Sequence, residues 1–364
     1  MGGVRAGGLM RVLAVRTVLP EHRYDQQQIT EAVAGTVRTD QRLLERLHSA
    51  TQVSGRNLAL PIEDYDRLTD FTAANDTYIA TALELAERAV REALDGAGVD
   101  PGDVDHLMFC SSTGVATPSL DAALAQRVGL REDIRRLPVF GLGCAAGAAG
   151  LSRVHDYLSA WPEQVAVLVC VELCSLTVQR DDASVANLVG SGLFGDGAAA
   201  VVAAGDRRRV RVRRPEGPGR GPRVVATASR LYPGTSRLMG WNVGEHGFRI
   251  VLAADLVDHV KATLADDVAA FLQGHGLSPG EIASWVCHPG GPKVIETIAE
   301  AFGLDSGELD LTWESLRGAG NLSSVSVLNV LEETIARRPR APGAPGLLMA
   351  LGPGFSAEMV LLRW

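Results

Sequence analysis

Residues Val139–Leu158 read VFGLGCAAGAAGLSRVHDYL, and this stretch decides the fold. A short apolar run ends in a glycine-rich turn, a single cysteine follows, and small residues then begin a helix. The turn places Cys144 at or near the N-terminus of that helix, where unpaired N–H groups and the helix dipole favour negative charge. The stretch therefore predicts a cysteine whose thiolate forms readily, and the alternative is an inert cysteine buried in a closely packed helix.

Composition limits the class of protein. The chain has 364 residues, 46% of them hydrophobic, and a mean hydropathy of +0.09, which suits two domains or one duplicated domain. A net charge of −8 argues against general nucleic-acid binding. Five unclustered cysteines are typical of reduced thiols. Because we find neither a signal peptide nor an apolar run long enough for a membrane span, we expect a cytoplasmic protein.

Apolar periodicity predicts alternating strands and helices along the chain. Strands are expected at residues 11–19, 104–110, 137–143, 165–174 and 198–203. Helices are expected over most of 25–48 and at 69–97 and 119–128. Residues 206–223 are highly charged and predict a surface hairpin or linker.

The second half of the chain repeats the first. The segment Leu94–Cys110, LDGAGVDPGDVDHLMFC, aligns without gaps with Leu272–His288, LQGHGLSPGEIASWVCH, at a constant offset of 178 residues. Such repetition predicts two similar α/β halves, residues 1–222 and 223–364, related by a pseudo-twofold axis. The same offset carries Gly143 onto Asn321, so the helix after Cys144 has a counterpart, and the two helices would lie back to back with their N-termini close together.

That geometry brings together three residue types suited to acyl transfer. A cysteine nucleophile needs a base or cation beside it and a hydrogen-bond donor for the oxyanion. His288, directly after the repeated strand, would lower the pKa of the Cys144 thiol by ion pairing. With Asn321 it would also hold a carbonyl oxygen as charge develops. Taken singly, a structural histidine and a helix-capping asparagine are the alternatives.

At these residues the sequence resembles the type III polyketide synthases, which are chalcone-synthase-like enzymes of the thiolase superfamily. The resemblance runs from about residue 10 to the end of the chain. It rests on GCAAG at Cys144, LFGDGAAA at Leu193–Ala200, HPGGPKVI at His288–Ile295, GNLSSVSVL at Gly320–Leu328 and LGPGFSAEMVLL near the C-terminus. It implies a thiolase-like α/β fold with αβαβα layers, a homodimer, and a type close to the bacterial members.

The resemblance implies a role for each of the three residues. Cys144 would carry the starter and the growing chain as a thioester. His288 and Asn321 would promote decarboxylation of malonyl-CoA and stabilise the enolate and the oxyanion. The implied substrates are malonyl-CoA and an acyl-CoA starter, and the product is a pyrone, resorcinol or related aromatic polyketide. No metal or redox cofactor is implied, because loss of CO2 itself generates the enolate.

The resemblance also implies a gated substrate pocket. Phe194 would be the gatekeeper ring, and a second gate position falls on Ile250, with Phe248 as its alternative. Thr117 stands where plant members have a methionine donated across the dimer, and Trp241 where they have a small residue. The remaining implied pocket residues are Cys174 and Thr177 on the cavity side and the cyclisation loop Gly352, Pro353 and Gly354.

The implied CoA-binding residues depart from the plant pattern. Of three basic residues in the helix that matches 43–50, only Arg46 is retained. Either Arg42 or Arg56 would compensate, or an acyl carrier protein (ACP) would deliver the starter instead of CoA. The implied CoA-binding set is Arg46, Arg56 and Ser323.

Three other functions were weighed. A ketoacyl-ACP synthase III also uses Cys, His and Asn on this fold, but its histidine motif usually continues with Gln-Ala-Asn, whereas here Pro289–Pro292 reads PGGP. A non-catalytic thiolase-fold acyl-binding partner predicts loss of one of the three residues, and none is lost. A cysteine hydrolase leaves the duplicated halves unexplained. The sequence therefore favours a condensing enzyme.

Overall fold

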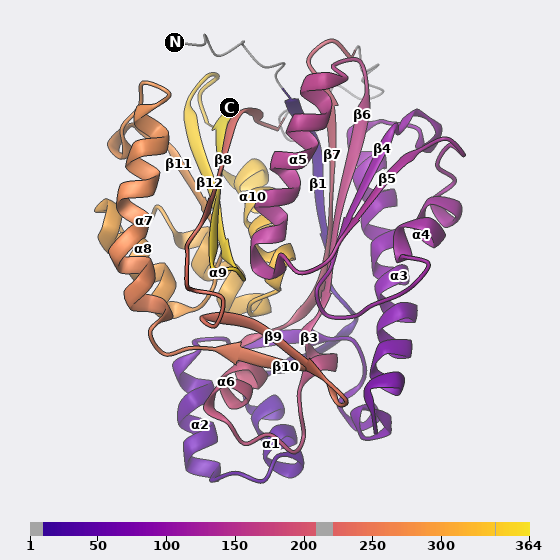
Figure 1. Ribbon diagram of the computed structural model, residues 1–364, viewed down its shortest axis with the longest axis vertical. Coiled ribbons are helices and arrows are strands. Elements are labelled where there is room, and N and C mark those ends of the chain that lie inside the picture. The colour runs from indigo at the N-terminus through magenta and orange to yellow at the C-terminus, as the bar shows by residue number, and fades with distance from the viewer. Residues whose placement is uncertain (1–9, 209–220, 339) are drawn as a thin grey trace.

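The computed structural model describes residues 10–208, 221–338 and 340–364. Most of the charged segment expected at 206–223 lies outside the described residues. The described chain forms a layered α/β structure in which two halves stand side by side (Figure 1). None of the described helices is long and apolar enough to cross a membrane.

The two halves have matching strand orders. In the N-terminal half the order is β1-β7-β6-β4-β5, and in the C-terminal half it is β8-β13-β12-β11. Strand β4 pairs in parallel with β6, as β11 does with β12, and the other pairs β6–β7, β7–β1, β12–β13 and β13–β8 are antiparallel. The strands are β1 (Met10–Val18), β4 (His106–Cys110), β5 (Arg135–Val139), β6 (Val165–Leu173), β7 (Asp196–Gly205), β8 (Arg223–Leu231), β11 (Ser284–Cys287), β12 (Pro345–Gly352) and β13 (Ser356–Arg363). The internal repeat predicted from the sequence is thus present as a repeated topology.

The halves join along β1 and β8, which share two residue pairs, so hydrogen bonding runs through nine strands. The described residues of the second half contain no strand equivalent to β5. The helix α9 (Asp310–Ala319) precedes Asn321 there instead. Strand β5 begins two residues before the expected range 137–143. It ends four residues earlier than expected, because residues 140–143 form the turn into Cys144. Four of its five residues are exposed, which leaves an open sheet edge.

Helices form the other layers, as Figure 1 shows. Helices α5 (Ala146–Ala160) and α10 (Ser326–Arg337) lie between the two sheet portions. Helices α3 (Phe71–Ala97) and α4 (Leu120–Val128) cover the outer face of the N-terminal half, and α7 (Leu256–Gln273) and α8 (Pro292–Phe302) cover that of the C-terminal half. The αβαβα arrangement is the predicted one. Periodicity predicts an apolar stripe on α3 made of Ile79, Leu83, Ala86, Val90 and Leu94; the last four are buried and Ile79 is half-buried.

The two central helices approach very closely at their N-termini. A Cβ atom built on Gly147 of α5 would lie 2.4 Å from the carbonyl oxygen of Ser324 and 2.6 Å from Cγ1 of Val327. Only glycine fits this contact. Short 3-10 turns, η3 (Gly143–Ala145) and η6 (Ser323–Val325), precede the helices and meet each other. The predicted juxtaposition of the two N-termini is confirmed.

A smaller helical layer lies at one end of the molecule (Figure 1). The region expected to be mostly helical contains α1 (Gln26–Thr36) and α2 (Gln41–Ala50), and the side chains of Asp25 and Asp40 cap their N-termini. The remaining elements are β2 (His22–Asp25), β3 (Gly55–Leu58), η1 (Ile62–Arg67), η2 (Pro101–Asp103), η4 (Cys174–Thr177), α6 (Val185–Leu193), β9 (Met239–Gly244), β10 (Gly247–Leu252) and η5 (Pro279–Glu281). The hairpin β9–β10 crosses toward α6 and carries three of the predicted pocket residues.

Candidate active site

Cys144 lies in η3 at the junction of the two halves. Its residue is 4% exposed, and its Sγ donates to Oγ of Ser323, 3.7 Å away, from the turn before the other central helix. The sequence offset had placed Gly143 opposite Asn321, and this contact between the two turns follows from it. The nucleophile candidate therefore faces the C-terminal half across the pseudo-twofold axis.

Asn321 is held by main-chain contacts with the LFGDG turn. Its N–H donates to the carbonyl of Leu193, and its carbonyl accepts from the N–H of Gly195. Its side-chain Nδ2 donates to the carbonyl of Gly290, 3.2 Å away, two residues after His288. The structure thus links the asparagine, the histidine loop and the predicted gate into one cluster.

His288 follows β11 and is buried. Its N–H donates to the carbonyl of Met349 in β12, which fixes the backbone, and its Nδ1 is buried without a hydrogen-bond partner. Burial lowers the pKa of His288 to about 3. The imidazole is therefore neutral at ordinary pH.

The thiol of Cys144 is also neutral, which differs from the sequence expectation. Burial raises its pKa to about 12, although the hydrogen bonds of Cys144 with Ser323 and Asn321 oppose the rise. Cys144 lies before the N-terminus of α5, as expected, but the loss of water around the sulfur raises the pKa of the thiol by more than the helix end lowers it. The expected thiolate–imidazolium pair is therefore not the resting state, and a proton must move from sulfur during attack.

Glu172 was not singled out from the sequence. It is fully buried at the end of β6 and accepts from the hydroxyl of Ser324 at 2.7 Å, that of Ser323 at 3.3 Å, and both the N–H and the hydroxyl of Ser112. Ser323 accepts from Cys144 and donates to this carboxylate, so a chain of hydrogen bonds leads from the sulfur to Glu172. Burial raises the pKa of Glu172, and its charge in turn raises that of Cys144. A carboxylate inside the apolar strand VAVLVCVEL was the available signal.

Phe194 and Ile250, which are predicted to form the gate, both lie beside Gly190 of α6. A Cβ built on Gly190 of α6 would lie 3.2 Å from Cδ1 of Ile250 and 3.7 Å from Cδ2 of Phe194, so the two side chains are neighbours. The main chain of Phe194 also forms a β-bridge with Asn321. Phe248 instead lies beside Trp241 and two other rings, with centroids 5.5–6.0 Å apart. Ile250, rather than Phe248, is therefore the neighbour of Phe194.

The predicted cyclisation loop packs against the turn that holds Cys144. A Cβ on Gly352 would lie 2.5 Å from Cβ of Ala145, and one on Gly143 would lie 2.8 Å from Pro353. Gly354 follows in the same turn between β12 and β13. Thr117 is exposed on the loop after β4.

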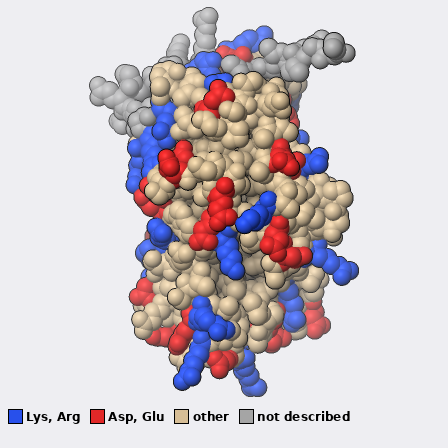
Figure 2. Space-filling model, turned by 90° about the vertical axis from the view of Figure 1, so that its left-hand side faces the viewer, with Lys and Arg blue, Asp and Glu red and all other residues tan. Residues whose placement is uncertain are grey.

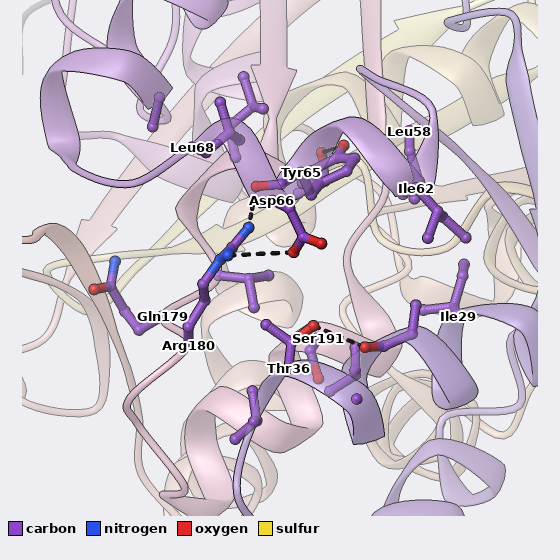
Figure 3. Close-up of a pocket in the computed structure, with 18 of the residues that line it drawn as sticks. Ile29, Thr36, Leu58, Ile62, Tyr65, Asp66, Leu68, Gln179, Arg180 and Ser191 are labelled. Atoms are coloured by element: carbon purple, nitrogen blue, oxygen red, sulfur yellow. Dashed lines mark hydrogen bonds and ion pairs between the residues drawn. The ribbon is translucent and has the colours of Figure 1, made fainter.

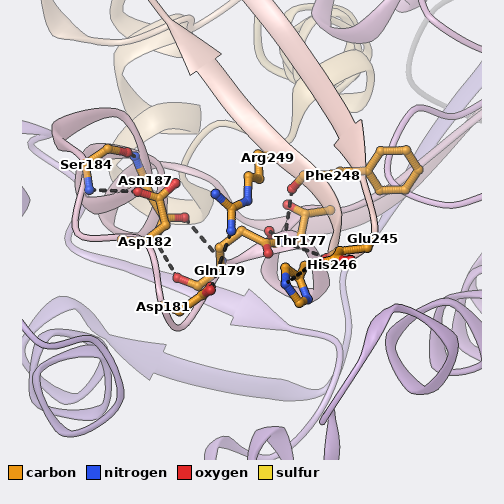
Figure 4. A network of polar contacts seen from close by, with 10 residues as sticks. All are labelled: Thr177, Gln179, Asp181, Asp182, Ser184, Asn187, Glu245, His246, Phe248 and Arg249. Carbon is orange, nitrogen blue, oxygen red and sulfur yellow. Dashed lines mark hydrogen bonds and ion pairs between the residues drawn. The ribbon is translucent and has the colours of Figure 1, made fainter.

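Cys174 and Thr177 belong to η4, and a polar network fixes this turn to its neighbours (Figure 4). Gln179 Nε2 donates to the carbonyls of Thr177, His246 and Phe248 at 3.1–3.2 Å. The side chain of Asn187 in α6 holds both the N–H and the carbonyl of Gln179. Gln179 therefore joins three elements that carry pocket residues: η4, the β9–β10 hairpin and α6. No sequence pattern indicates this role of Gln179.

The predicted CoA-binding residues lie in different environments. Arg46 and Arg42 are exposed on α2. On the face of the molecule shown in Figure 2, Lys and Arg side chains project among Asp and Glu. Arg56 is 1% exposed, and its Nη2 donates to the carbonyl of Ser191. A guanidinium buried in this way does not meet phosphates at the surface, so the assignment of Arg56 to them is wrong. Ser323 faces Cys144 and Glu172 instead of a surface channel.

Taken together, the duplicated αβαβα fold and the Cys144, His288 and Asn321 cluster define a thiolase-fold condensing enzyme. Residues 2–207 match the N-terminal domain of the chalcone and stilbene synthases, and residues 223–364 match the C-terminal domain. The chain therefore belongs to the chalcone and stilbene synthase family and is a type III polyketide synthase of the bacterial type.

Similar proteins agree with this assignment. The chain is 53% identical over 357 residues to a 1,3,6,8-tetrahydroxynaphthalene synthase of Streptomyces peucetius subsp. caesius, covering 97% of this chain and 93% of that one. It is 32% identical to a 3,5-dihydroxyphenylacetyl-CoA synthase of Streptomyces toyocaensis, covering 97% and 90%. The crystal structure of the tetrahydroxynaphthalene synthase of Streptomyces coelicolor A3(2) superposes with a TM-score of 0.89 at 31% identity, covering 97% and 99%. The family match favours the polyketide synthase over the ketoacyl-ACP synthase III alternative.

Proposed function

We propose that this synthase condenses malonyl-CoA units on Cys144 and closes the chain to a naphthalene-type polyphenol. The observation that carries the proposal is the contact of the Cys144 sulfur with the turn that bears Asn321 and Ser323. It brings a nucleophile and a carbonyl-binding amide from the two halves to one place. The 53% identity to a tetrahydroxynaphthalene synthase supports the choice of product class.

Loading begins with proton transfer from Cys144. Because both the thiol and His288 are neutral at rest, the imidazole acts as the base, and the proton leaves sulfur as it attacks the thioester carbonyl. CoA departs with that proton, and the acyl group stays on the sulfur. The Asn321 amide donates to the oxyanion of the tetrahedral intermediate.

Extension requires an enolate. The thioester carbonyl of a second malonyl-CoA binds between the Asn321 amide and an N–H of His288, and loss of CO2 leaves its electron pair on the α-carbon. That carbon attacks the acyl group on Cys144, so a carbon–carbon bond forms as the carbon–sulfur bond breaks. A neutral imidazole suits this role, because it donates a hydrogen bond without carrying a charge that would hold the carboxylate.

This chemistry consumes no electrons from outside. We therefore propose that the enzyme needs neither metal nor redox cofactor, and that activity survives exhaustive dialysis against EDTA. The substrates are CoA thioesters. Arg42 and Arg46 on α2 are the exposed cations that we propose bind the phosphates of CoA. Delivery of a starter by acyl-ACP is the remaining alternative for the first step.

We further propose a cytoplasmic homodimer. Strand β5 presents an open, exposed edge that carries the exposed Leu137, and Phe140, the residue after the strand, is 52% exposed. Pairing of β5 with β5 of a second copy would cover both the strand edge and the exposed apolar side chains. It would also bring the exposed loop that contains Thr117 against the partner.

The test is product analysis with malonyl-CoA as the sole substrate. A ten-carbon tetrahydroxynaphthalene requires five two-carbon units, so we expect mass spectrometry to find a product whose carbons all come from malonyl-CoA. Cys144→Ala should abolish the product and retain some CO2 release, whereas His288→Ala and Asn321→Ala should impair CO2 release itself. Products formed only with an added acyl starter would contradict the naphthalene assignment, and normal CO2 release in both of those last variants would contradict the roles.

A further inference from the structure

A cavity of about 630 Å³ opens to the surface beside the gate, and it has no assigned role. It lies between α1, η1 and the segment that follows β6, as Figure 3 shows with Ile29, Tyr65 and Arg180 around it. Its inner end is formed by the buried residues Cys174 and Ser191 and the half-buried Phe194. Its volume is in the range of about 300–1,000 Å³ typical of small-molecule sites.

The inner end adjoins the catalytic cluster without including it. Phe194 lines the cavity, and its main chain forms the bridge with Asn321. Cys174 lies close enough to Cys144 for one thiolate to raise the pKa of the other thiol. Yet Cys144, His288 and Asn321 are not among the lining residues, and neither are Arg42 and Arg46 of α2. The cavity is therefore a side chamber behind the gate.

The walls and the mouth of this chamber differ in character. The walls are largely apolar, with Ile29, Val33, Leu58, Ile62, Leu68, Leu176 and Val178. The mouth carries five exposed carboxylates, Glu31, Glu63, Asp66, Asp70 and Asp181. Two arginines line the chamber: Arg56 is buried, and Arg180 is already paired with Asp66 at 3.4 Å and donates to the carbonyl of Tyr65 (Figure 3).

The carboxylates at the mouth determine which molecules can pass through it. CoA carries several phosphate charges, and the like charges of the exposed carboxylates at the mouth repel it. A flat, uncharged polyphenol meets apolar walls that suit its rings, and its hydroxyls donate hydrogen bonds to carboxylates. The mouth is thus unsuited to CoA and suited to an aromatic product.

We propose that this chamber is a second binding site, one that takes the uncharged aromatic product and releases it by a route separate from the path of CoA. This inference rests on the proposed polyketide synthase function. The finished ring system passes Cys174 and Phe194 at the inner end of the chamber and leaves through the acidic mouth. CoA and product then occupy the enzyme at the same time.

The test measures simultaneous binding in the Cys144→Ala protein, which cannot form the acyl thioester. The probe is 1,3-dihydroxynaphthalene, titrated by calorimetry with and without saturating CoA. We expect its Kd to change less than about twofold when CoA is present, because the two sites are separate. Mutual exclusion of the probe and CoA would overturn the proposal, since it would mean one shared cavity.

A matched pair of variants on α1 locates the site. Ala32 is half-buried and lines the chamber, whereas Ala34 is exposed on the same helix and does not line it. We expect Ala32→Trp to weaken binding of the probe by about tenfold or more, a loss of about 1.4 kcal/mol, and Ala34→Trp to leave it unchanged. Equal Kd values in the two variants would refute the location.

Kinetics separate this proposal from the proposed function. With an intact Cys144, Ala32→Trp should slow steady-state turnover while leaving CO2 release in the first turnover at the rate of the Ala34→Trp control. An unchanged steady-state rate would contradict the exit route. Failure of the parent enzyme to release any CO2 from malonyl-CoA would contradict the proposed function instead, and the binding measurements would still decide whether the chamber is a site.

Discussion

Replacement of Gly147 by alanine tests the contact on which the active site depends. The new Cβ would lie 2.4 Å from a main-chain oxygen of Ser324, and ordinary contact begins at 3.4 Å, so α5 and α10 must separate by about 1 Å. Backbone cannot rotate away, which places the overpacking cost at the upper end of about 1–3 kcal/mol, while the helix preference of alanine over glycine returns about 1 kcal/mol. We expect a net loss of about 2 kcal/mol in the free energy of unfolding.

The effect on activity should exceed the effect on folding. The same 1 Å shift separates Cys144 from Ser323, and misplacement of that size costs about 100-fold in rate. Denaturant unfolding and the steady-state rate of product formation measure the two effects on one preparation. Gly318→Ala is the matched control, because Gly318 lies inside α9 with nothing within 4 Å of a Cβ, and there alanine should stabilise by about 0.5–1 kcal/mol without loss of activity.

A Gly147→Ala protein with stability and turnover close to those of the parent would refute this reasoning. It would mean that the two helices part at no cost or that the sulfur does not depend on the contact between them.

Three further predictions concern the acid–base state, the pocket wall and the dimer. Because burial lowers the pKa of His288 to about 3, CO2 release by Cys144→Ala should stay constant from about pH 8 to pH 5, and a decline centred near 6.5 would show an ordinary imidazole. Gln179→Leu removes the donor that holds Phe248 and its hairpin, so we expect a changed distribution of product lengths with CO2 release retained, and a parallel loss of both would indicate a merely structural role. Leu137→Glu should convert the dimer to a monomer in light scattering, because a charge on β5 disfavours edge pairing, and an intact dimer would place the interface elsewhere.

The architecture was predictable because the two halves of the chain have similar sequences. Matching segments at a fixed offset indicated two halves, and the offset itself placed Cys144 beside the turn of Asn321, as the structure has it. The long amphipathic stretch of α3 was equally readable, since its buried stripe follows helical periodicity. Local pattern and tertiary packing agree at these places.

Properties that depend on burial were not predictable. The helix N-terminus suggested an easily formed thiolate at Cys144, but desolvation, which no local pattern reports, raises its pKa. Arg56 looked like a surface cation and is buried. Gln179 lies in an ordinary polar segment, and its role arises only because a hairpin nearly 70 residues later folds against it, with a contact at a sequence separation of 69.

The most direct test of the central claim is mass spectrometry of the protein stopped shortly after mixing with malonyl-CoA. The account predicts that the peptide containing Cys144 carries a ladder of two-carbon keto units, and that His288→Ala shows at most the loaded starter. The absence of any adduct on that peptide, or a ladder on the peptide containing Cys174 instead, would contradict the claim that this enzyme builds its chain on Cys144.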